Sequence, residues 1–269
     1  MEKGSKFPFY GREIQGEVVF ARNIILDTNQ LSVDEFIARL PIYERRRRWF
    51  LHPGLRFLVR LIARVDVTGL ENVPKSGGTI VMMNHVSTLD PPFISAVIAH
   101  RQAITMAKLE TKDNFIIETT NNWWGNFKVN RGEVDRFALN SAIELVKHGQ
   151  LLLMSPEGTR HKDGLQEPKD GLAYIAQKAD AIVQPVAITG VLDWQERLKK
   201  LQRIHAKIHF GKPFKFNPIE GERVNKLLRA KMMREAMYQL ALTIPNESAF
   251  LRGHFADIEN ASMETLTFV

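Results

Sequence analysis

The sequence predicts an α/β fold with a mostly parallel central sheet flanked by helices. Short apolar runs at 79–83, 151–154 and 182–188 alternate with helix-like segments from residue 65 onward. Strands separated by helices favour parallel pairing, and a continuous apolar run is typical of a strand buried on both faces. A stretch rich in arginine and apolar residues comes before this region and predicts basic amphipathic helices at its N-terminal side.

Each element is predicted from its local pattern and its breakers. Pro53 and Gly54, which follow His52, are expected to divide the basic stretch into two helices. Strands are expected at 65–70, 79–83, 103–107, 126–131, 151–154, 182–188 and 206–210, and helices at 91–99, 135–149, 172–178 and 222–244. The expected organisation is an N-terminal extension (1–40), basic amphipathic membrane-associating helices (41–64), an α/β domain (65–245) and a C-terminal tail (246–269).

Composition limits the class of protein. With 269 residues, of which 44% are hydrophobic, the chain can bury one large core or two modest ones. It has no cysteine, so disulfides, a thiol nucleophile and thiolate metal sites are excluded. No apolar run approaches the roughly 18 residues of a spanning helix, and the N-terminus lacks an apolar signal-peptide core. We therefore expect neither an ordinary secreted protein nor an integral membrane protein.

The positive charge is concentrated in one segment. The formal net charge is +7, and seven arginines without an acid lie between residues 45 and 65. Three of them recur every four residues beside a broad apolar face, which is typical of a helix in an anionic membrane interface. The alternative is a helix docked on the domain with its arginines in water, and nucleic acid is disfavoured because no stacking aromatics interleave with the charges. The expected membrane-binding residues are Arg45, Arg46, Arg47, Arg48, Trp49, Phe50, Arg56, Arg60 and Arg64.

His85 and Asp90 are the candidate catalytic pair. Imidazole titrates near neutral pH, and a carboxylate can orient it and stabilise its charged form. Residues five apart lie about 140° apart around a helix, so the two side chains meet only if a turn brings Asp90 back. The alternative is that Asp90 is only a helix N-cap, with Pro91 at the first helical position.

Polar residues follow three of the predicted strands, where ligands bind in parallel sheets. The ends are 84–85, 130–131 and 155–160. Arginines near a His/Asp pair indicate a pocket for a phosphate-bearing substrate, because guanidinium binds phosphate through two parallel hydrogen bonds. Taken singly, residues 130–131 can be a surface turn, and residues 155–160 can be a salt-bridged turn in which Glu157 pairs with Arg160. The candidate substrate-binding residues are Lys128, Arg131, Glu157, Gly158, Thr159 and Arg160.

Other catalytic patterns are missing or misplaced. The sequence has no G-x-S-x-G elbow, no phosphate-binding G-x-x-x-x-G-K-[ST] loop and no G-x-G-x-x-G. His205 and His209 have the spacing of metalloprotease ligands but lack the glutamate and lie on a predicted strand, so we interpret them as structural. We expect no metal site.

Four motifs, in order, resemble those of the glycerolipid acyltransferase superfamily. N-H-V-S-T-L-D-P resembles the first motif, G-N-F-K-V-N-R-G the second, S-P-E-G-T-R the third and V-Q-P-V-A-I the fourth. They cover roughly residues 65–215, and within the superfamily the chain looks most like bacterial 1-acyl-sn-glycerol-3-phosphate acyltransferases. The chain departs from the usual motifs at Asn130, Ser155 and His161, which belong to the acceptor side of the family's site.

The resemblance implies direct acyl transfer from an acyl thioester to a lysophospholipid, most simply 1-acyl-sn-glycerol 3-phosphate, giving phosphatidic acid. His85 would be the general base, Asp90 would orient it, and Arg131 and Arg160 would hold the acceptor phosphate. The donor would be acyl-CoA or an acyl carrier protein thioester, with no other cofactor. The expected location is the cytoplasmic side of a membrane, bound peripherally. The alternatives are a related enzyme with another lipid acceptor and a non-catalytic lipid-surface binding protein.

Overall fold

The computed structural model describes residues 33–108, 119, 123–129, 136–217 and 225–269. The helices are α1 (Val33–Arg46), the π-helical turn η2 (Arg47–Leu51), α2 (His52–Ile62), η3 (Leu70–Asn72), α3 (Asp90–Val97), α5 (Arg136–Lys147), α6 (Gly171–Ala179), α7 (Trp194–Lys199), α8 (Lys226–Thr243), η5 (Asn246–Phe255) and η6 (Ile258–Asn260). The strands are β1 (Ala63–Thr68), β2 (Thr79–Met83), β3 (Ala103–Lys108), β4 (Phe127–Val129), β5 (Leu151–Met154), β6 (Ile182–Thr189), β7 (Ile204–Phe210), β8 (Phe214–Phe216) and β9 (Leu266–Phe268).

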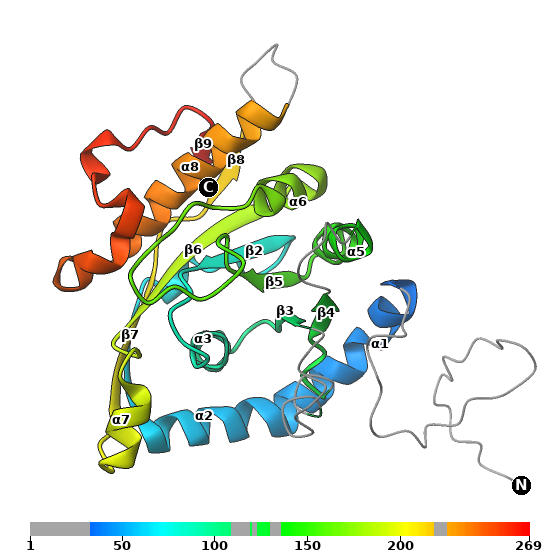
Figure 1. The fold of residues 1–269 in the computed structure, drawn as a ribbon. Helices are drawn as coiled ribbons and strands as arrows, with labels where there is room; N and C mark the ends of the chain where they lie inside the picture. Colours follow the sequence, from blue (N-terminus) through cyan, green and yellow to red (C-terminus); the bar gives the residue numbers. More distant parts are fainter. Residues whose placement is uncertain (1–32, 109–118, 120–122, 130–135, 218–224) are drawn as a thin grey trace, which may run out of the picture.

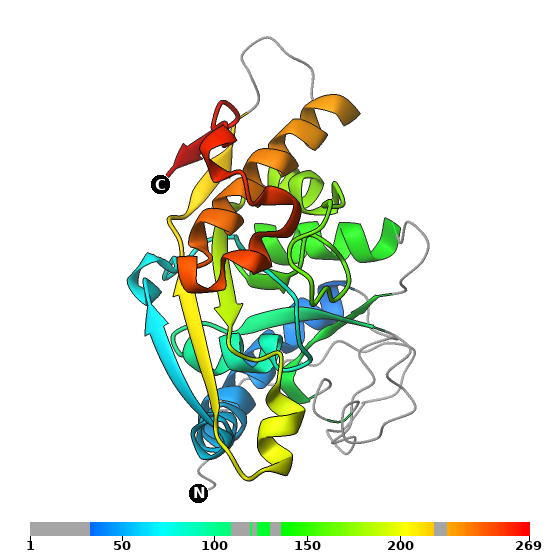
Figure 2. The same cartoon turned by 60° about the vertical axis from the view of Figure 1, so that its left-hand side comes forward.

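The described strands form one mixed sheet in the order β1-β7-β6-β2-β5-β3-β4, and β8 joins β6 to β9 at one side. The pairs β1–β7, β6–β2, β2–β5, β5–β3 and β3–β4 are parallel, whereas β6–β7, β6–β8 and β8–β9 are antiparallel. Figure 2 shows β1 and β7 running side by side as long neighbours. The predicted α/β class with a mostly parallel sheet is confirmed.

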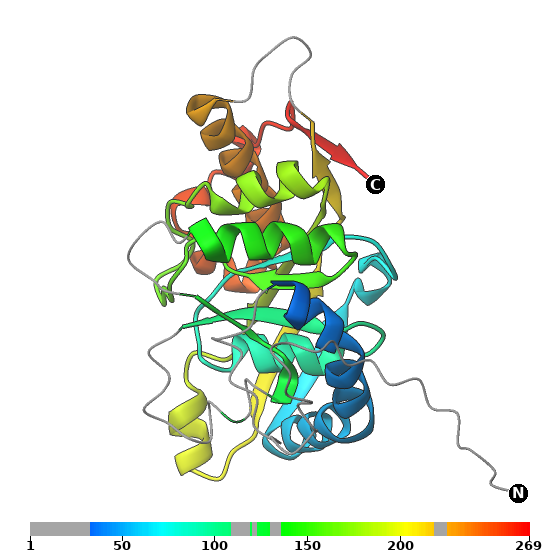
Figure 3. The ribbon, with the colours of Figure 1, turned by 90° about the vertical axis from the view of Figure 1, so that its right-hand side faces the viewer.

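Helices cover both faces of the sheet (Figure 1), which explains the sequence pattern of its strands. α5, α6 and α8 lie on one face, and α3 lies on the other with α2 beneath it. The central strand β2 is buried along its whole length, so both of its faces select apolar side chains. In β7, by contrast, Ile204, Ala206, Ile208 and Phe210 alternate with less buried residues, as expected where one face is covered. Figure 3 shows α5 and α6 packed next to each other on their face.

The N-terminal helices differ from the prediction. The chain does not break at Pro53, because helical backbone conformations continue from α1 through η2 into α2. Pro53 lies in the first turn of α2, and its ring would clash with the carbonyl of Trp49 in a regular α-helix. The wider π-helical turn that precedes it accommodates the proline without ending the helix.

Residues 246–269, which we expected only as a C-terminal tail, pack against the domain. The Arg252 side chain is 8% exposed and donates to the carbonyls of Ala241 (3.2 Å) and Ile244 (2.9 Å) at the end of α8. Within η5, the Leu251 carbonyl accepts from the Leu165 N–H at 3.0 Å, and the His254 N–H donates to the Leu165 carbonyl at 2.9 Å. We call these two hydrogen bonds the C-terminal clasp. They fix the loop that follows β5 from outside the sheet.

Candidate active site

His85 and Asp90 meet in the turn between β2 and α3. His85 Nδ1 lies 2.9 Å from Asp90 Oδ2. The same oxygen accepts the backbone N–H groups of Val86 and Ser87, both at 2.7 Å, so three donors converge on one carboxylate oxygen. Asp90 is the first residue of α3, and the hydrogen bonds that its side chain accepts come from residues 85–87, before that helix. The interpretation as only an N-cap is therefore wrong, because the carboxylate binds the preceding turn and His85 instead.

The pair is placed for proton transfer at one ring nitrogen. Asp90 is fully buried, and that burial raises the pKa of its carboxyl group against the lowering effect of its hydrogen bonds from His85, Ser87 and Val86. The His85 side chain is 13% exposed, and its Nδ1 is engaged by Asp90. A carboxylate at Nδ1 favours the tautomer with hydrogen on that atom. Nε2 is then the nitrogen with a free lone pair, which is the form a general base needs.

The turn after β5 holds the backbone of His85 on both sides. β2 and β5 are parallel neighbours, so their carboxyl ends lie at the same edge of the sheet, as predicted. The Glu157 carboxylate accepts the backbone N–H of His85 and also that of Gln166, the latter at 3.1 Å. The His161 N–H donates to the His85 carbonyl at 2.8 Å. Both backbone polar groups of His85 are thus tied to this turn.

Glu157 is a buried acid with a strongly shifted pKa. Its side chain is 4% exposed, and burial raises its pKa to about 7 despite the two backbone hydrogen bonds, from Gln166 and His85, that lower it. The alternative of a salt-bridged Glu157–Arg160 turn is wrong, since no ion pair joins these two residues and Arg160 is exposed. Glu157 connects the two motifs instead of pairing within its own.

The other predicted binding residues are distributed unevenly. Gly158 has φ +74°, a conformation that favours glycine, and a Cβ at this position would lie 3.2 Å from Lys169 Nζ. Thr159 is exposed in the same turn. Lys128 lies in β4 opposite Ala107 of β3. Arg131, the remaining member of the set, lies outside the described residues. The structure thus brings the first and third predicted strand ends together and leaves the second untested.

Several residues that support the site were missed by the sequence reasoning. The Asn84 side chain donates to the Ile188 carbonyl at 3.0 Å and accepts the Ile188 N–H at 2.8 Å, so it anchors the end of β2 to β6. An asparagine directly after a strand is a signal in the sequence, because its side-chain amide can donate and accept hydrogen bonds as the backbone does. Leu165 and Gln166 act through their backbone groups, which carry no signal in the sequence. Ser87 accepts the Leu89 N–H through Oγ at 3.2 Å, which gives it a turn-forming role.

The basic segment has one buried member and an exposed aromatic surface. Arg47 is 2% exposed, its Nη1 donates to the Ala99 carbonyl at 3.4 Å, and burial lowers its pKa. The prediction that Arg47 faces a membrane is therefore wrong, because η2 turns this residue toward the domain. By contrast, Trp49 (70%), Phe50 (72%) and Phe57 (71%) are largely exposed. Among the described residues, no helix combines the length and apolar character that crossing a membrane requires.

Comparisons with known proteins agree with this arrangement. A family model described as Acyltransferase matches residues 64–189, which include both members of the pair and the Glu157 turn. The 1-acyl-sn-glycerol-3-phosphate acyltransferase of Bacillus subtilis (strain 168) is 28% identical over 158 residues, covering 56% of this chain and 75% of that protein. The probable 1-acyl-sn-glycerol-3-phosphate acyltransferase of Mycoplasma pneumoniae is 26% identical over 194 residues, or 65% of this chain and 72% of that protein.

A solved structure has the same fold. The crystal structure of the 1-acyl-sn-glycerophosphate (LPA) acyltransferase PlsC from Thermotoga maritima superposes with a TM-score of 0.52 at 22% identity, covering 71% of this chain and 79% of that chain. Residues 64–189 therefore match the Acyltransferase family model, and the chain is similar to bacterial 1-acyl-sn-glycerol-3-phosphate acyltransferases.

Proposed function

We propose that this acyltransferase moves a fatty acyl group from an acyl thioester to the free hydroxyl of 1-acyl-sn-glycerol 3-phosphate, giving phosphatidic acid. The observation that carries the proposal is the His85–Asp90 pair, 2.9 Å apart and anchored at the carboxyl end of β2. The names of the curated relatives support the choice of acceptor. The absence of cysteine accommodates direct transfer, without an acyl-cysteine intermediate.

In this reaction His85 Nε2 removes the proton of the acceptor hydroxyl as the oxygen attacks the thioester carbonyl. The new C–O ester bond forms, the C–S bond breaks, and the leaving thiolate takes the proton from the imidazolium. Asp90 stabilises the imidazolium through its bond to Nδ1. Glu157 and the His161 N–H hold the His85 backbone in one conformation, so the imidazole is already in position for the reaction.

The acceptor phosphate is assigned to arginine in the turn after β5. Arg160 is exposed and immediately precedes His161, whose N–H binds the His85 carbonyl. A guanidinium there can hold a phosphate beside the imidazole through two parallel hydrogen bonds. Arg131 is proposed as a second ligand from its place in the second motif, and Lys128 as its neighbour.

The basic segment is proposed to bind an anionic membrane surface. In addition to Trp49 and Phe50 of η2 and Phe57 of α2, Leu61 is 63% exposed, and Arg56 and Arg60 of α2 are exposed beside Phe57 and Leu61. Exposed apolar groups beside arginines suit the boundary between acyl chains and charged headgroups. Val59, on the opposite side of α2, is buried in the core, so one face of the helix is committed to the domain and the other is not.

Acyl transfer with purified protein tests the catalytic proposal. Labelled acyl-CoA and acyl carrier protein thioesters are supplied with a panel of lysolipids, and labelled phosphatidic acid is the expected main product. His85→Ala should reduce kcat at least about 100-fold, since general-base catalysis contributes 10²–10⁴. His148→Ala is the matched control, because His148 is exposed at the end of α5 that leads into the opposite end of β5. Full activity of His85→Ala would show that the mechanism is wrong. A different labelled lipid product would show that the acceptor is another lysolipid.

Vesicle co-sedimentation tests the membrane proposal. Phe57→Ser combined with Leu61→Ser should weaken binding to anionic vesicles, because both side chains are largely exposed and removing them leaves the core intact. Arg56→Ser should weaken binding at low salt more than at high salt, since charge attraction is screened. Binding that is indifferent to all three substitutions and to salt would contradict this orientation.

A further inference from the structure

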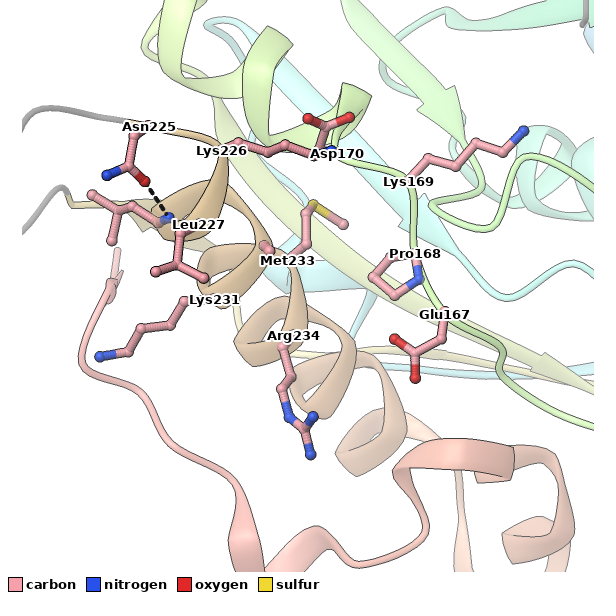
Figure 4. A pocket seen from close by; sticks show the side chains of 12 residues that line it. Glu167, Pro168, Lys169, Asp170, Asn225, Lys226, Leu227, Lys231, Met233 and Arg234 are labelled. Carbon is pink, nitrogen blue, oxygen red and sulfur yellow. Dashed lines mark hydrogen bonds between the residues drawn. The ribbon is translucent and has the colours of Figure 1, made fainter.

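A groove lies between the loop that follows the third motif and the N-terminal half of α8 (Figure 4). It has a volume of about 860 Å³, and its walls are residues 167–170 and the first turns of α8, with Met233 among its lining residues. The family match ends at residue 189, so α8 contributes a wall from outside the matched domain. No step of the mechanism proposed above uses this groove.

The groove has an excess of positive charge that the structure does not neutralise. Of its two acids, Asp170 pairs with Arg229 at 3.6 Å, and Glu167 lies 3.6 Å from the ring of His254; both partners lie outside the lining. Lys169 and Lys226 are exposed, and neither forms an ion pair within the described part of the chain. Lys231 and Arg234 also line the groove, so four cations face two acids there, and Lys231 pairs with Glu264 outside the lining.

The start of α8 adds to this positive potential. Asn225 caps the helix by accepting the Leu228 N–H at 2.8 Å (Figure 4). The other N–H groups of the first turn have no partner within the helix, and the 18-residue helix directs its positive end toward this wall. Lys226 lies in that turn. Cationic side chains beside a helix N-terminus form an arrangement that favours phosphate.

Lys169 connects the groove with the reacting centre. Its backbone N–H donates to the Pro156 carbonyl at 2.9 Å, which ties the groove wall to the turn after β5. In Figure 4 its side chain points away from α8. A Cβ added at Gly158 would lie 3.2 Å from its ammonium nitrogen, and Gly158 follows Glu157, which binds the His85 backbone. A ligand that carries negative charge at Lys226 and extends past Lys169 would thus run toward the turn after β5 that holds His85.

We propose that the groove binds the phosphate of the acyl donor's carrier, namely the phosphopantetheine chain that coenzyme A and acyl carrier protein share. In both donors a pantetheine arm separates the thioester from the phosphate. When the thioester lies at the catalytic histidine, the phosphate therefore binds away from it, at the far end of the arm. Lys226 and the start of α8 hold the phosphate, and Lys169 lies along the path of the arm. This assignment rests on the proposed acyl transfer, and it deepens that proposal by naming where the donor enters.

The test uses the full chain and the charge reversal Lys226→Glu. A glutamate in the first turn of α8 is favourable for the helix, so the variant should fold. The matched control is Lys75→Glu, an exposed lysine before the N-terminal end of β2, at the opposite end from His85. Free coenzyme A is titrated calorimetrically into each protein. Lys226→Glu should raise its Kd about tenfold, equivalent to about 1.4 kcal/mol, and Lys75→Glu should leave it unchanged.

Kinetics then separate the possible sources of the phosphate. In Lys226→Glu, the KM for acyl-CoA should rise about tenfold, whereas the KM values for acyl-pantetheine, which lacks the phosphate, and for the lysolipid should not change. A parallel rise with acyl carrier protein thioesters assigns the site to the shared phosphate, and a rise with acyl-CoA alone assigns it to the nucleotide phosphates. Unchanged Kd and KM, or a rise in the lysolipid KM alone, would overturn the proposal. If the wild type transfers no acyl group, the proposed function fails, and the calorimetric comparison still decides the role of the groove.

Discussion

Replacing Asp90 with asparagine should separate activity from stability. Asp90 Oδ2 accepts three hydrogen bonds, from His85 Nδ1 at 2.9 Å and from the N–H groups of Val86 and Ser87 at 2.7 Å each. The single amide oxygen of asparagine can keep the two backbone donors, which hold the turn, but it brings no charge to the imidazolium. The turn should therefore persist while the histidine loses the negative charge of its partner.

The expected size of the effect follows from these contacts. A hydrogen bond to a charged group contributes about 1.5–3 kcal/mol, so its loss alone slows the reaction roughly 10- to 150-fold. In serine proteases the same substitution also leaves the histidine in the wrong tautomer and lowers kcat about 10⁴-fold. We expect kcat to fall at least about 100-fold. Burial disfavours the charge on Asp90, so the neutral amide should leave Tm within a few degrees of the wild type.

Initial rates with a labelled acyl donor at saturating lysolipid measure kcat, and thermal unfolding measures Tm. A kcat within about threefold of the wild type would refute the role of Asp90 in orienting His85. A fall in Tm of more than about 8 °C, equivalent to roughly 2–4 kcal/mol for a domain of this size, would show that the carboxylate mainly supports the turn.

Two further predictions concern the support of the site. Burial raises the pKa of Glu157 from 4.5 to about 7. The wild type should therefore lose stability relative to Glu157→Gln as pH rises from about 4.5 to 7, by at most roughly 3 kcal/mol. Urea unfolding at several pH values measures the two free energies of unfolding, and parallel dependences on pH would contradict the prediction. Gly253→Ala should destabilise the protein by about 3 kcal/mol and lower activity, because φ is +49° and the added Cβ would lie 2.2 Å from the Leu165 carbonyl oxygen. Gly54→Ala, where a Cβ meets nothing within 4 Å, is its control, and equal unfolding midpoints for the two variants would count against the clasp.

Local patterns in the sequence were sufficient to predict an element where its residues share the same kind of environment. The apolar run of β2 predicts a central strand because both faces of that strand are covered. The spacing of His85 and Asp90 predicts a turn because no helix or strand lets them meet, and the hydrogen bond at 2.9 Å confirms that they do. Strand ends can be placed at one edge of the sheet because parallel pairing brings them there.

Long-range contacts between backbone groups could not be predicted in the same way. Arg47 belongs to a run of four arginines whose composition gives no reason to bury one of them, and only the π-helical turn before Pro53 decides which one faces the domain. The N–H of Gln166 supports Glu157 whatever side chain it carries. The same holds for Leu165 in the C-terminal clasp, 86 positions from the Leu251 carbonyl that its N–H binds.

The C-terminal clasp has a consequence for when the enzyme becomes active during synthesis. Translation releases the His85 turn and the Glu157 turn long before η5, and domains generally begin to fold from the N-terminal side. A nascent chain that has not yet exposed Leu251 and His254 lacks the partners that fix Leu165, one residue from the N–H that binds Glu157. The order of the chain thus places completion of the Glu157 turn after synthesis of η5, and we expect a chain that stops before Leu251 to lack the contacts that fix Leu165.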